Sequence, residues 1–277
     1  MHWGDNADSY NARVSSVAII GLIIGSFAAG FFVKNGRRQC IIYMSILCAV
    51  GIVPTLFKNI WFILVGKFIY GFSASVIIVA SSLYLQETVP AEKSATFDFT
   101  TNFGVILGIT ICLVSGFGLP TSEQGKLDDH VYWRVILGFP LVFIVLQLIL
   151  WITVFKLESL KNCFALKEYD QARQQVAKIY LTSDQSIKEK IFDQYHENYD
   201  QSQANTGVRP GYIAVLCDST YCVATWFSMG LAFFNQFSGV NCITIYSTSL
   251  FDSLNINSAV GSALVGIFQL LGCLLAT

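Results

Sequence analysis

Seven long apolar segments run along the chain and restrict what it can fold into. They cover about residues 14–33, 40–57, 60–85, 96–118, 132–155, 219–247 and 256–277. About 20 helical residues cross the hydrocarbon core of a bilayer, and helices satisfy their backbone hydrogen bonds internally there. The sequence therefore predicts an all-α fold, a polytopic membrane helix bundle with about seven transmembrane helices in a multi-pass membrane protein.

The composition agrees with a membrane location. Charged residues make up 13% of the 277 residues and hydrophobic residues 54%, whereas an ordinary soluble domain is about 25% charged. The formal net charge of -1 and the absence of a Lys/Arg-rich tract exclude a nucleic-acid partner. Eight scattered cysteines with no Cys-x-x-Cys motif are expected to be small buried side chains. No metal and no cofactor is expected.

The basic residues predict the orientation of the chain. Six of them follow the first and fifth segments: Lys34, Arg37, Arg38, Lys156, Lys161 and Lys167. The positive-inside rule places these loops in the cytosol. Residue 1 and the loop Lys126–His130 are then extracellular. Because the N-terminus has no signal-peptide pattern, we expect a further helix upstream of it.

One soluble connector divides the chain. The segment Lys156–Arg209 holds 16 of the 35 charged residues. This predicts a first bundle at 1–155, a cytosolic connector with amphipathic helices at 156–209, and the first two helices of a second bundle at 210–277. Apolar residues three and four apart predict a helix over Leu166–Leu181. We expect this helix to pack on the cytosolic ends of the bundle in preference to lying on lipid, because its polar face has no excess of Lys/Arg.

Five side-chain amides lie at membrane depth. They are Asn102, Asn235, Gln236, Asn241 and Gln269. An amide without a partner in hydrocarbon costs roughly 2–7 kcal/mol, so these groups should face a wet cavity or a protein interior. Amides both donate and accept hydrogen bonds, which suits a neutral sugar or polyol better than an ion. The alternative is that lone amides such as Asn102 and Gln269 bond between helices, at about 0.6 kcal/mol each.

The cluster in the sixth segment predicts a broken helix. Gln236 and Asn241 lie about 140° apart on an ideal helix, which is too wide for one ligand-facing stripe. A break costs least at Gly239. Discontinuous helices commonly build the midplane sites of transporters.

Several motifs resemble, in their order and spacing, those of the sugar porters of the major facilitator superfamily. This group includes the facilitative glucose transporters. The motifs are Asn235-Gln236-Phe237-Ser238-Gly239-Val240-Asn241 followed by Tyr246–Phe251, Gly36-Arg37-Arg38, Gly66–Gly71, Tyr84–Pro90 and Trp133-Arg134. The resemblance covers nearly the whole chain. It implies that the seven segments correspond to helices 2 to 8 of a twelve-helix fold.

The resemblance also implies roles for individual residues. Asn102, Gln236 and Asn241 would contact the sugar, and Asn235 and Gln269 match further sugar-binding positions. Arg37, Arg38 and Glu87 match a cytosolic gate, and Tyr246 matches an extracellular gate. The implied function is transmembrane transport of a neutral, hexose-like sugar by alternating access, as part of a longer transporter.

The cytosolic gate departs from the family pattern at three places. No acidic residue precedes Gly36, the expected Arg-Gly after Pro90 reads Ser94-Ala95, and the Pro-Glu-Ser-Pro-Arg signature appears as Leu157-Glu158-Ser159-Leu160-Lys161. Arg37 or Arg38 is still able to pair with Glu87. The alternative is that these charged residues are ordinary loop residues exposed to water.

Three alternatives to a working transporter remain at this stage. A truncated, transport-inactive relative is the main one, and we expect the 277 residues not to catalyse transport alone unless a homo-oligomer completes the site. A heptahelical receptor is less consistent with the sequence, because its Asp-Arg-Tyr and Asn-Pro-x-x-Tyr motifs are missing. An enzyme is not expected, because no catalytic motif is present and His2, His130 and His196 lie outside the segments.

Overall fold

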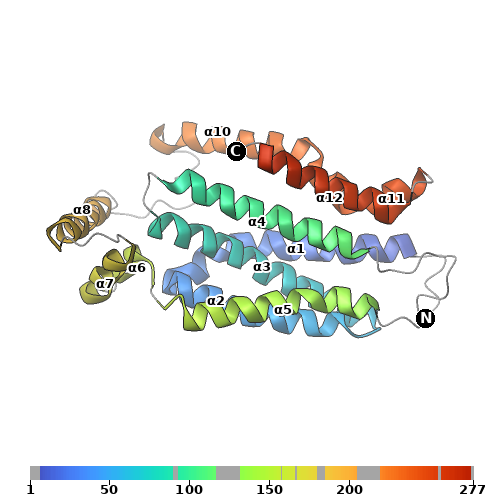
Figure 1. The fold of residues 1–277 in the computed structure, drawn as a ribbon, viewed down its shortest axis with the longest axis horizontal. Coiled ribbons are helices and arrows are strands. Elements are labelled where there is room, and N and C mark those ends of the chain that lie inside the picture. Colours follow the sequence, from blue (N-terminus) through green and yellow to red (C-terminus); the bar gives the residue numbers. More distant parts are fainter. Residues whose placement is uncertain are drawn as a thin grey trace. The chain divides into compact units, whose positions relative to one another are not determined.

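The computed structural model describes residues 7–89, 93–116, 132–156, 158–165, 167–179, 185–204, 219–254 and 257–275. Within these ranges the chain is helical and contains no strand (Figure 1). The helices are α1 (Ala7–Phe32), α2 (Arg37–Thr55), α3 (Ile60–Thr88), α4 (Ser94–Ser115), α5 (Tyr132–Thr153), α6 (Leu160–Ala165), α7 (Tyr169–Ile179), α8 (Gln185–Ala204), α10 (Ser219–Phe237), α11 (Val240–Ser253) and α12 (Ser258–Leu275), with a short 3₁₀ helix η1 (Val33–Asn35). The predicted all-α class is confirmed.

The described residues separate into two compact units. The first lies within residues 1–97 and 128–195 and the second within residues 98–127 and 196–277. The first unit therefore holds α1–α3 and α5–α7, and the second holds most of α4 together with α10–α12. The domain boundaries near residues 155 and 209 remain a prediction.

Close packing of α1 against α3 organises the first unit. Gly21 and Gly25 on α1 lie against the backbone of Phe68 and Phe72 on α3, because small residues four apart let helix backbones approach in lipid. Gly104 and Gly108, which have the same spacing on α4, have no neighbouring atom of the described chain within the reach of a Cβ. The same sequence pattern therefore marks a helix contact in only one of the two places.

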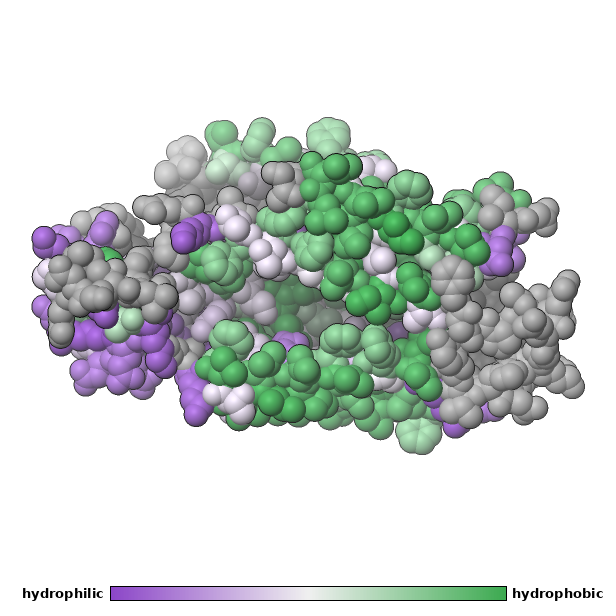
Figure 2. All heavy atoms as spheres, in the orientation of Figure 1, coloured by the Kyte–Doolittle hydropathy of each residue, from purple (hydrophilic) through white to green (hydrophobic). Residues whose placement is uncertain are grey.

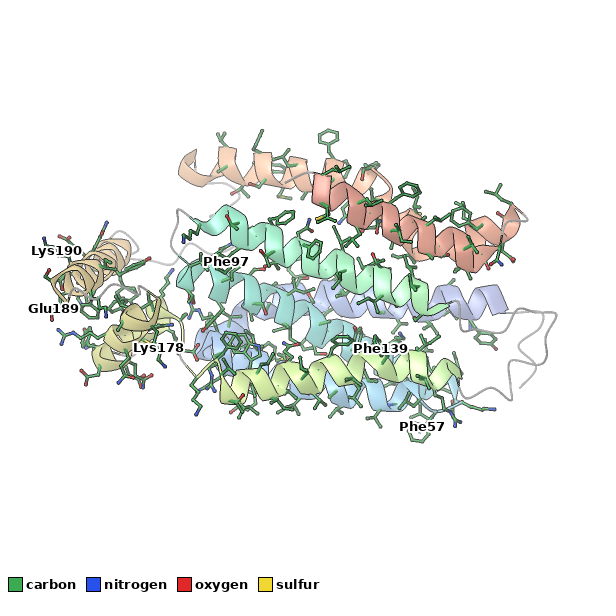
Figure 3. All side chains as sticks on the ribbon, viewed as in Figure 1. Phe57, Phe97, Phe139, Lys178, Glu189 and Lys190 are labelled. Atoms are coloured by element: carbon green, nitrogen blue, oxygen red, sulfur yellow. The ribbon has the colours of Figure 1, made fainter. Side chains whose placement is uncertain are left out.

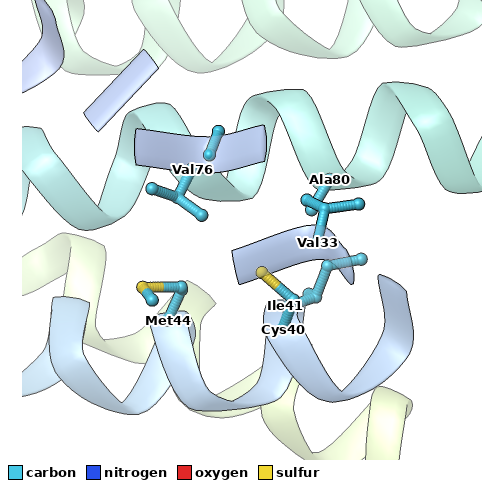
Figure 4. Close-up of a cluster of buried hydrophobic side chains, with 7 residues drawn as sticks. Val33, Cys40, Ile41, Met44, Val76 and Ala80 are labelled. Atoms are coloured by element: carbon cyan, nitrogen blue, oxygen red, sulfur yellow. The ribbon is translucent and has the colours of Figure 1, made fainter. Parts of the chain in front are cut away.

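A buried apolar cluster joins three helices of this unit at one end (Figure 4). Its members come from α1 with η1, from α2 and from α3: Ala29, Val33, Cys40, Ile41, Met44, Val76 and Ala80. Helix α5 adds a second cluster by packing Ile144 against Cys48 and Ile52 of α2. These contacts hold the start of α2 and the end of α3 in a defined arrangement.

Six described helices are long and apolar enough to cross a bilayer: α1–α5 and α12. Their outward faces carry large apolar side chains such as Phe27 and Phe143, which are 77% and 52% exposed. Figure 2 shows apolar residues over α2 and α5 and hydrophilic residues over α6 and α7. This distribution suits lipid around the spans and water around the connector.

The sixth apolar segment, about residues 219–247, is divided into two helices, in agreement with the predicted break. Helix α10 ends at Phe237 and α11 begins at Val240. Neither is among the six helices that meet the length and hydropathy of a span. The division between the two helices lies at Gly239, which has a positive φ.

The amphipathic helix predicted over Leu166–Leu181 begins at Tyr169, and positions 166, 180 and 181 of the prediction lie outside the described residues. Helix α7 covers Tyr169–Ile179, Lys167 and Glu168 before it are not helical, and Leu160–Ala165 form the separate helix α6. Ala172 and Val176 of the predicted stripe are buried. Helix α7 contacts α6, and Arg173 on α7 lies over the ring of Phe192 on α8 at 5.2 Å.

Several charged residues of the connector are exposed on α7 and α8. Lys178 on α7 and Glu189 and Lys190 on α8 project from these helices (Figure 3). Helix α6 contacts both α7 and α3. The connector is thus attached to the first bundle through α6. The loop Lys126–His130, predicted to be extracellular, lies outside the described residues.

The α1–α3 contact leads to a stability prediction. We expect Gly71→Ala to lower the melting temperature of the purified chain, because the new Cβ would overlap the carbonyl oxygen of Ala18. Overpacking of this kind typically costs about 1–3 kcal/mol. Gly104→Ala is the matched control: it gains the same helix propensity but meets no described atom within 4 Å. Equal melting temperatures for the two variants would contradict the close contact.

Candidate functional site

The site begins at the break between α10 and α11. Gly239 has φ 75° and ψ 1°, a left-handed conformation that glycine adopts without the steric cost of a Cβ. The Ser238 hydroxyl donates to the carbonyl of Asn235 at 2.7 Å, and the Ile243 amide donates to the carbonyl of Gly239 at 2.9 Å as α11 starts. The predicted break at Gly239 is confirmed.

The break brings two of the predicted amides together. Asn241 Nδ2 donates to Gln236 Oε1 at 2.6 Å. An unbroken helix would hold these side chains about 140° apart. Both residues, like Asn235, are exposed, so their remaining donors and acceptors are open to a ligand.

Gln269 reaches α11 from the neighbouring helix. Its Nε2 donates to Thr244 Oγ1 at 2.8 Å. Two contacts seat α12 for this bond: the ring of Phe251 lies over Gly261, and Thr110 Oγ1 on α4 donates to the carbonyl of Gly266 at 2.9 Å. The glycines therefore allow neighbouring elements to approach α12 closely.

The fifth amide stands apart from the others. Asn102 is exposed on α4, about two helical turns before Thr110. Within the described residues no hydrogen bond joins Asn102 to the other predicted amides. Its assignment to the sugar site stays a prediction.

The chemistry of these helices suits a neutral polar ligand. Along α10, α11 and α12 the only Asp, Glu, Lys, Arg or His is Asp252, in the last turn of α11. Each primary amide carries two N–H donors and an oxygen with two lone pairs. After the Gln236–Asn241 bond, both side chains keep unused donors and acceptors. They could bind adjacent hydroxyl groups.

The predicted cytosolic gate residues lie in the first unit. Arg37 Nη2 and Glu87 Oε1 form an ion pair at 2.8 Å, with side chains only 15% and 13% exposed. Arg37 Nη1 also donates to Asn162 Oδ1 of α6 at 3.4 Å. This pair joins the first turn of α2 to the last turn of α3. Of the two pairings that the sequence allowed, Arg37–Glu87 is the one that forms.

Arg38 has different partners. Its backbone amide donates to Glu158 Oε1 at 2.8 Å, and its Nη2 donates to the carbonyl of Trp151 at 3.0 Å. The Arg38 guanidinium therefore binds carbonyls at the C-terminal end of α5, where a positive charge is favourable. Successive residues of a helix point about 100° apart, which is why Arg37 and Arg38 serve different neighbours.

Glu158 and Asn162 are functional candidates that the sequence reading did not select. The Glu158 carboxylate binds the N-terminus of α2, where free backbone N–H groups and the helix dipole favour an anion. Gly36 directly precedes α2 and has φ 126°. A side chain at position 36 would approach Glu158 and Asn162. The sequence signal that could have identified Glu158 is that the segment Leu157–Lys161 keeps the glutamate of the Pro-Glu-Ser-Pro-Arg signature. Tyr246, on α11, is 47% exposed, and its gate role remains a prediction.

The cysteines only partly follow the expectation of burial. Cys40, Cys48, Cys163 and Cys273 are buried, whereas Cys112 and Cys242 are exposed; all of those described are free thiols. Burial, followed by the nearby carboxylates of Glu158 and Glu168, raises the pKa of the Cys163 thiol to about 11. This thiol stays protonated at neutral pH, which disfavours nucleophilic chemistry. The described residues contain no cluster of His, Cys, Asp and Glu that could hold a metal ion.

Known proteins match this chain along most of its length. A family model described as sugar (and other) transporter matches residues 2–277. Facilitated glucose transporter member 3 of Gallus gallus is 26% identical over 252 residues, which is 88% of this chain and 48% of that protein. Hexose transporter 1 of Toxoplasma gondii is 23% identical over 274 residues, covering 94% of this chain and 47% of that protein. The chain thus spans about half the length of these curated relatives.

Solved structures match the fold. The proton:xylose symporter XylE of the major facilitator superfamily, bound to 6-bromo-6-deoxy-D-glucose, gives a TM-score of 0.80 at 19% identity, covering 99% of this chain and 60% of that chain. The partially occluded inward-open form of XylE from E. coli gives 0.73 at 18% identity, covering 97% and 62%. The helices described above therefore follow the major facilitator fold.

The family match decides against two of the alternatives left open by the sequence. A transporter family model that spans nearly the whole chain excludes the heptahelical receptor and confirms that the protein is not an enzyme. The membrane-spanning helices agree with this result. The chain belongs to the sugar (and other) transporter family and is a multi-pass membrane protein.

Proposed function

We propose that this chain supplies part of the substrate site of a transporter that moves a neutral, hexose-like sugar across a membrane by alternating access. The observation that carries the proposal is the Gln236–Asn241 pair across the Gly239 break, 2.6 Å between nitrogen and oxygen. Relatives of similar sequence are a facilitated glucose transporter and a hexose transporter. Their substrates support the same class of ligand here.

The polar groups fit this substrate chemically. A sugar hydroxyl donates one hydrogen bond and accepts others, as an amide does. Gln236 and Asn241 hold each other in place, which reduces the side-chain entropy lost on binding. Charged side chains are nearly absent from α10–α12, so an ionic substrate would have no counterpart on these helices.

The cytosolic cluster has a role in the transport cycle under this proposal. The Arg37–Glu87 ion pair connects α2 to α3. The bond from the Arg38 amide to Glu158 connects α2 to the connector. Alternating access moves one bundle relative to another around the site. Since these contacts lie within the first unit, they would keep the ends of α2 and α3 and the connector together as that bundle moves.

Direct sugar binding tests the proposal. The purified 277-residue chain in lipid nanodiscs is mixed with radiolabelled glucose, fructose, galactose or xylose, and bound label is measured at equilibrium. We expect saturable binding of at least one sugar, displaced by the same unlabelled sugar and not by glutamate. The absence of saturable binding for all four would overturn the proposal.

The same preparation in liposomes separates binding from transport. Uptake measured at low and high protein density tests the prediction that the chain does not transport alone unless a homo-oligomer completes the site. Binding without uptake at either density would identify a transport-inactive chain.

A further inference from the structure

Thr244 has two hydrogen bonds whose directions are linked. Its Oγ1 donates to the carbonyl of Val240 at 2.8 Å, the usual bond from a helical threonine to the turn before it. A hydroxyl has a single proton. Toward Gln269, 2.8 Å away, Thr244 can therefore only accept.

This restriction orients the Gln269 amide. The group that faces Thr244 must be the NH₂ end, because the carbonyl end would place two acceptors together. Gln269 Oε1 then points away, and it is buried with no partner among the described residues. A buried acceptor without a donor is unfavourable, and a ligand O–H is one group that would satisfy it.

Thr244 also lies between the Gln236–Asn241 pair and Gln269. It lies three residues after Asn241, so the two side chains share a face of α11. Gln269 lies one turn after Gly266 on α12, and the Gly266 carbonyl accepts a hydrogen bond from Thr110 on α4. The orientation of Gln269 therefore depends on groups held by two neighbouring helices.

We propose that Thr244 is a positioning residue for sugar specificity: by binding the nitrogen of Gln269 it makes the site present a hydrogen-bond acceptor, and so selects a sugar hydroxyl that donates. This inference rests on the proposed function and specifies its recognition. It predicts that one hydroxyl of the sugar is required as a donor.

Deoxy and deoxyfluoro sugars report the direction of such a bond. Fluorine accepts weakly and cannot donate, and a deoxy position does neither. Competition binding compares glucose with analogues that are altered at each hydroxyl in turn. The same series is measured with Gln269→Ala, and the hydroxyl that contacts Gln269 is the one whose alteration no longer changes affinity in that variant. At that hydroxyl we expect the deoxy and fluoro analogues to bind the wild-type chain equally weakly, about five- to 150-fold below glucose.

Thr244→Val is the critical variant, because it keeps the shape and removes the acceptor. Its Gln269 amide is free to turn over and offer N–H, so the fluoro analogue should bind several-fold better than the deoxy analogue, while the glucose hydroxyl can still accept from that N–H. Thr244→Ser keeps the hydroxyl and should restore the wild-type order of the three sugars. Melting temperatures confirm that each variant is folded.

The possible results separate the two proposals. If no sugar binds to the wild-type chain, the proposed function fails and the specificity of Thr244 falls with it. If sugar binds but Thr244→Val keeps the wild-type order of analogues, only the role of Thr244 is overturned. A wild-type chain that prefers the fluoro analogue over the deoxy analogue at the Gln269-dependent hydroxyl would also overturn it.

Discussion

Replacing Gln236 or Asn241 with alanine is expected to reduce sugar affinity about five- to 150-fold. Each change removes a group that would bind the sugar, at a cost of about 1–3 kcal/mol per buried partner left unpaired. It also removes the 2.6 Å bond that holds the other amide. The measurement is equilibrium binding of the labelled sugar in nanodiscs.

The pair should act as a unit. Because either single change frees its partner, the double variant is expected to lose less affinity than the product of the two single losses. Cys242→Ala is the matched control, since Cys242 is exposed and adjacent to Asn241 on α11. Unchanged affinity in both single variants would remove Gln236 and Asn241 from the sugar site.

Breaking the Arg37–Glu87 pair should have the largest effect on stability. Both side chains are more than four-fifths buried, and removing one charge leaves the other without compensation. We expect Glu87→Ala to lower the free energy of unfolding by about 3 kcal/mol, the lower end of the range for a buried pair because some exposure remains. Thermal unfolding of the purified chain measures the loss.

Two further variants separate the pair from the individual charges. Lys34→Ala removes an exposed charge near the same end of α2 and should change stability little. The exchange Arg37→Glu with Glu87→Arg should recover part of the stability lost in either single reversal. If Glu87→Ala unfolds at the same temperature as Lys34→Ala, the pair does not stabilise this end of the bundle.

Local physics explains the features that were predictable. A run such as residues 60–85 has to be a helix in lipid wherever its neighbours lie, because its backbone has no other hydrogen-bond partners. Gly239 was the cheapest place to break the sixth segment because glycine tolerates positive φ, and α10 and α11 meet there. Arg37–Glu87 was one of two pairings that charge alone permitted.

Other features depend on contacts between distant segments. Glu158 binds the amide of Arg38 across 120 residues, and nothing in the local pattern shows that its carboxylate would reach the start of α2. Gly21 meets a neighbouring helix, whereas Gly104 does not meet one in the described chain. Spacing of small residues shows that a close approach is allowed, and packing decides where it happens.

The amides show the same division. The sequence by itself determined that uncharged hydrogen-bonding side chains lie in apolar segments, that the helix breaks at Gly239, and hence which class of ligand suits them. Only the tertiary structure decided that Gln236 binds Asn241 and that Thr244 holds the nitrogen of Gln269. The physical reason is that composition and periodicity act within a helix, whereas the direction of a hydrogen bond depends on how neighbouring segments and helices are oriented relative to one another.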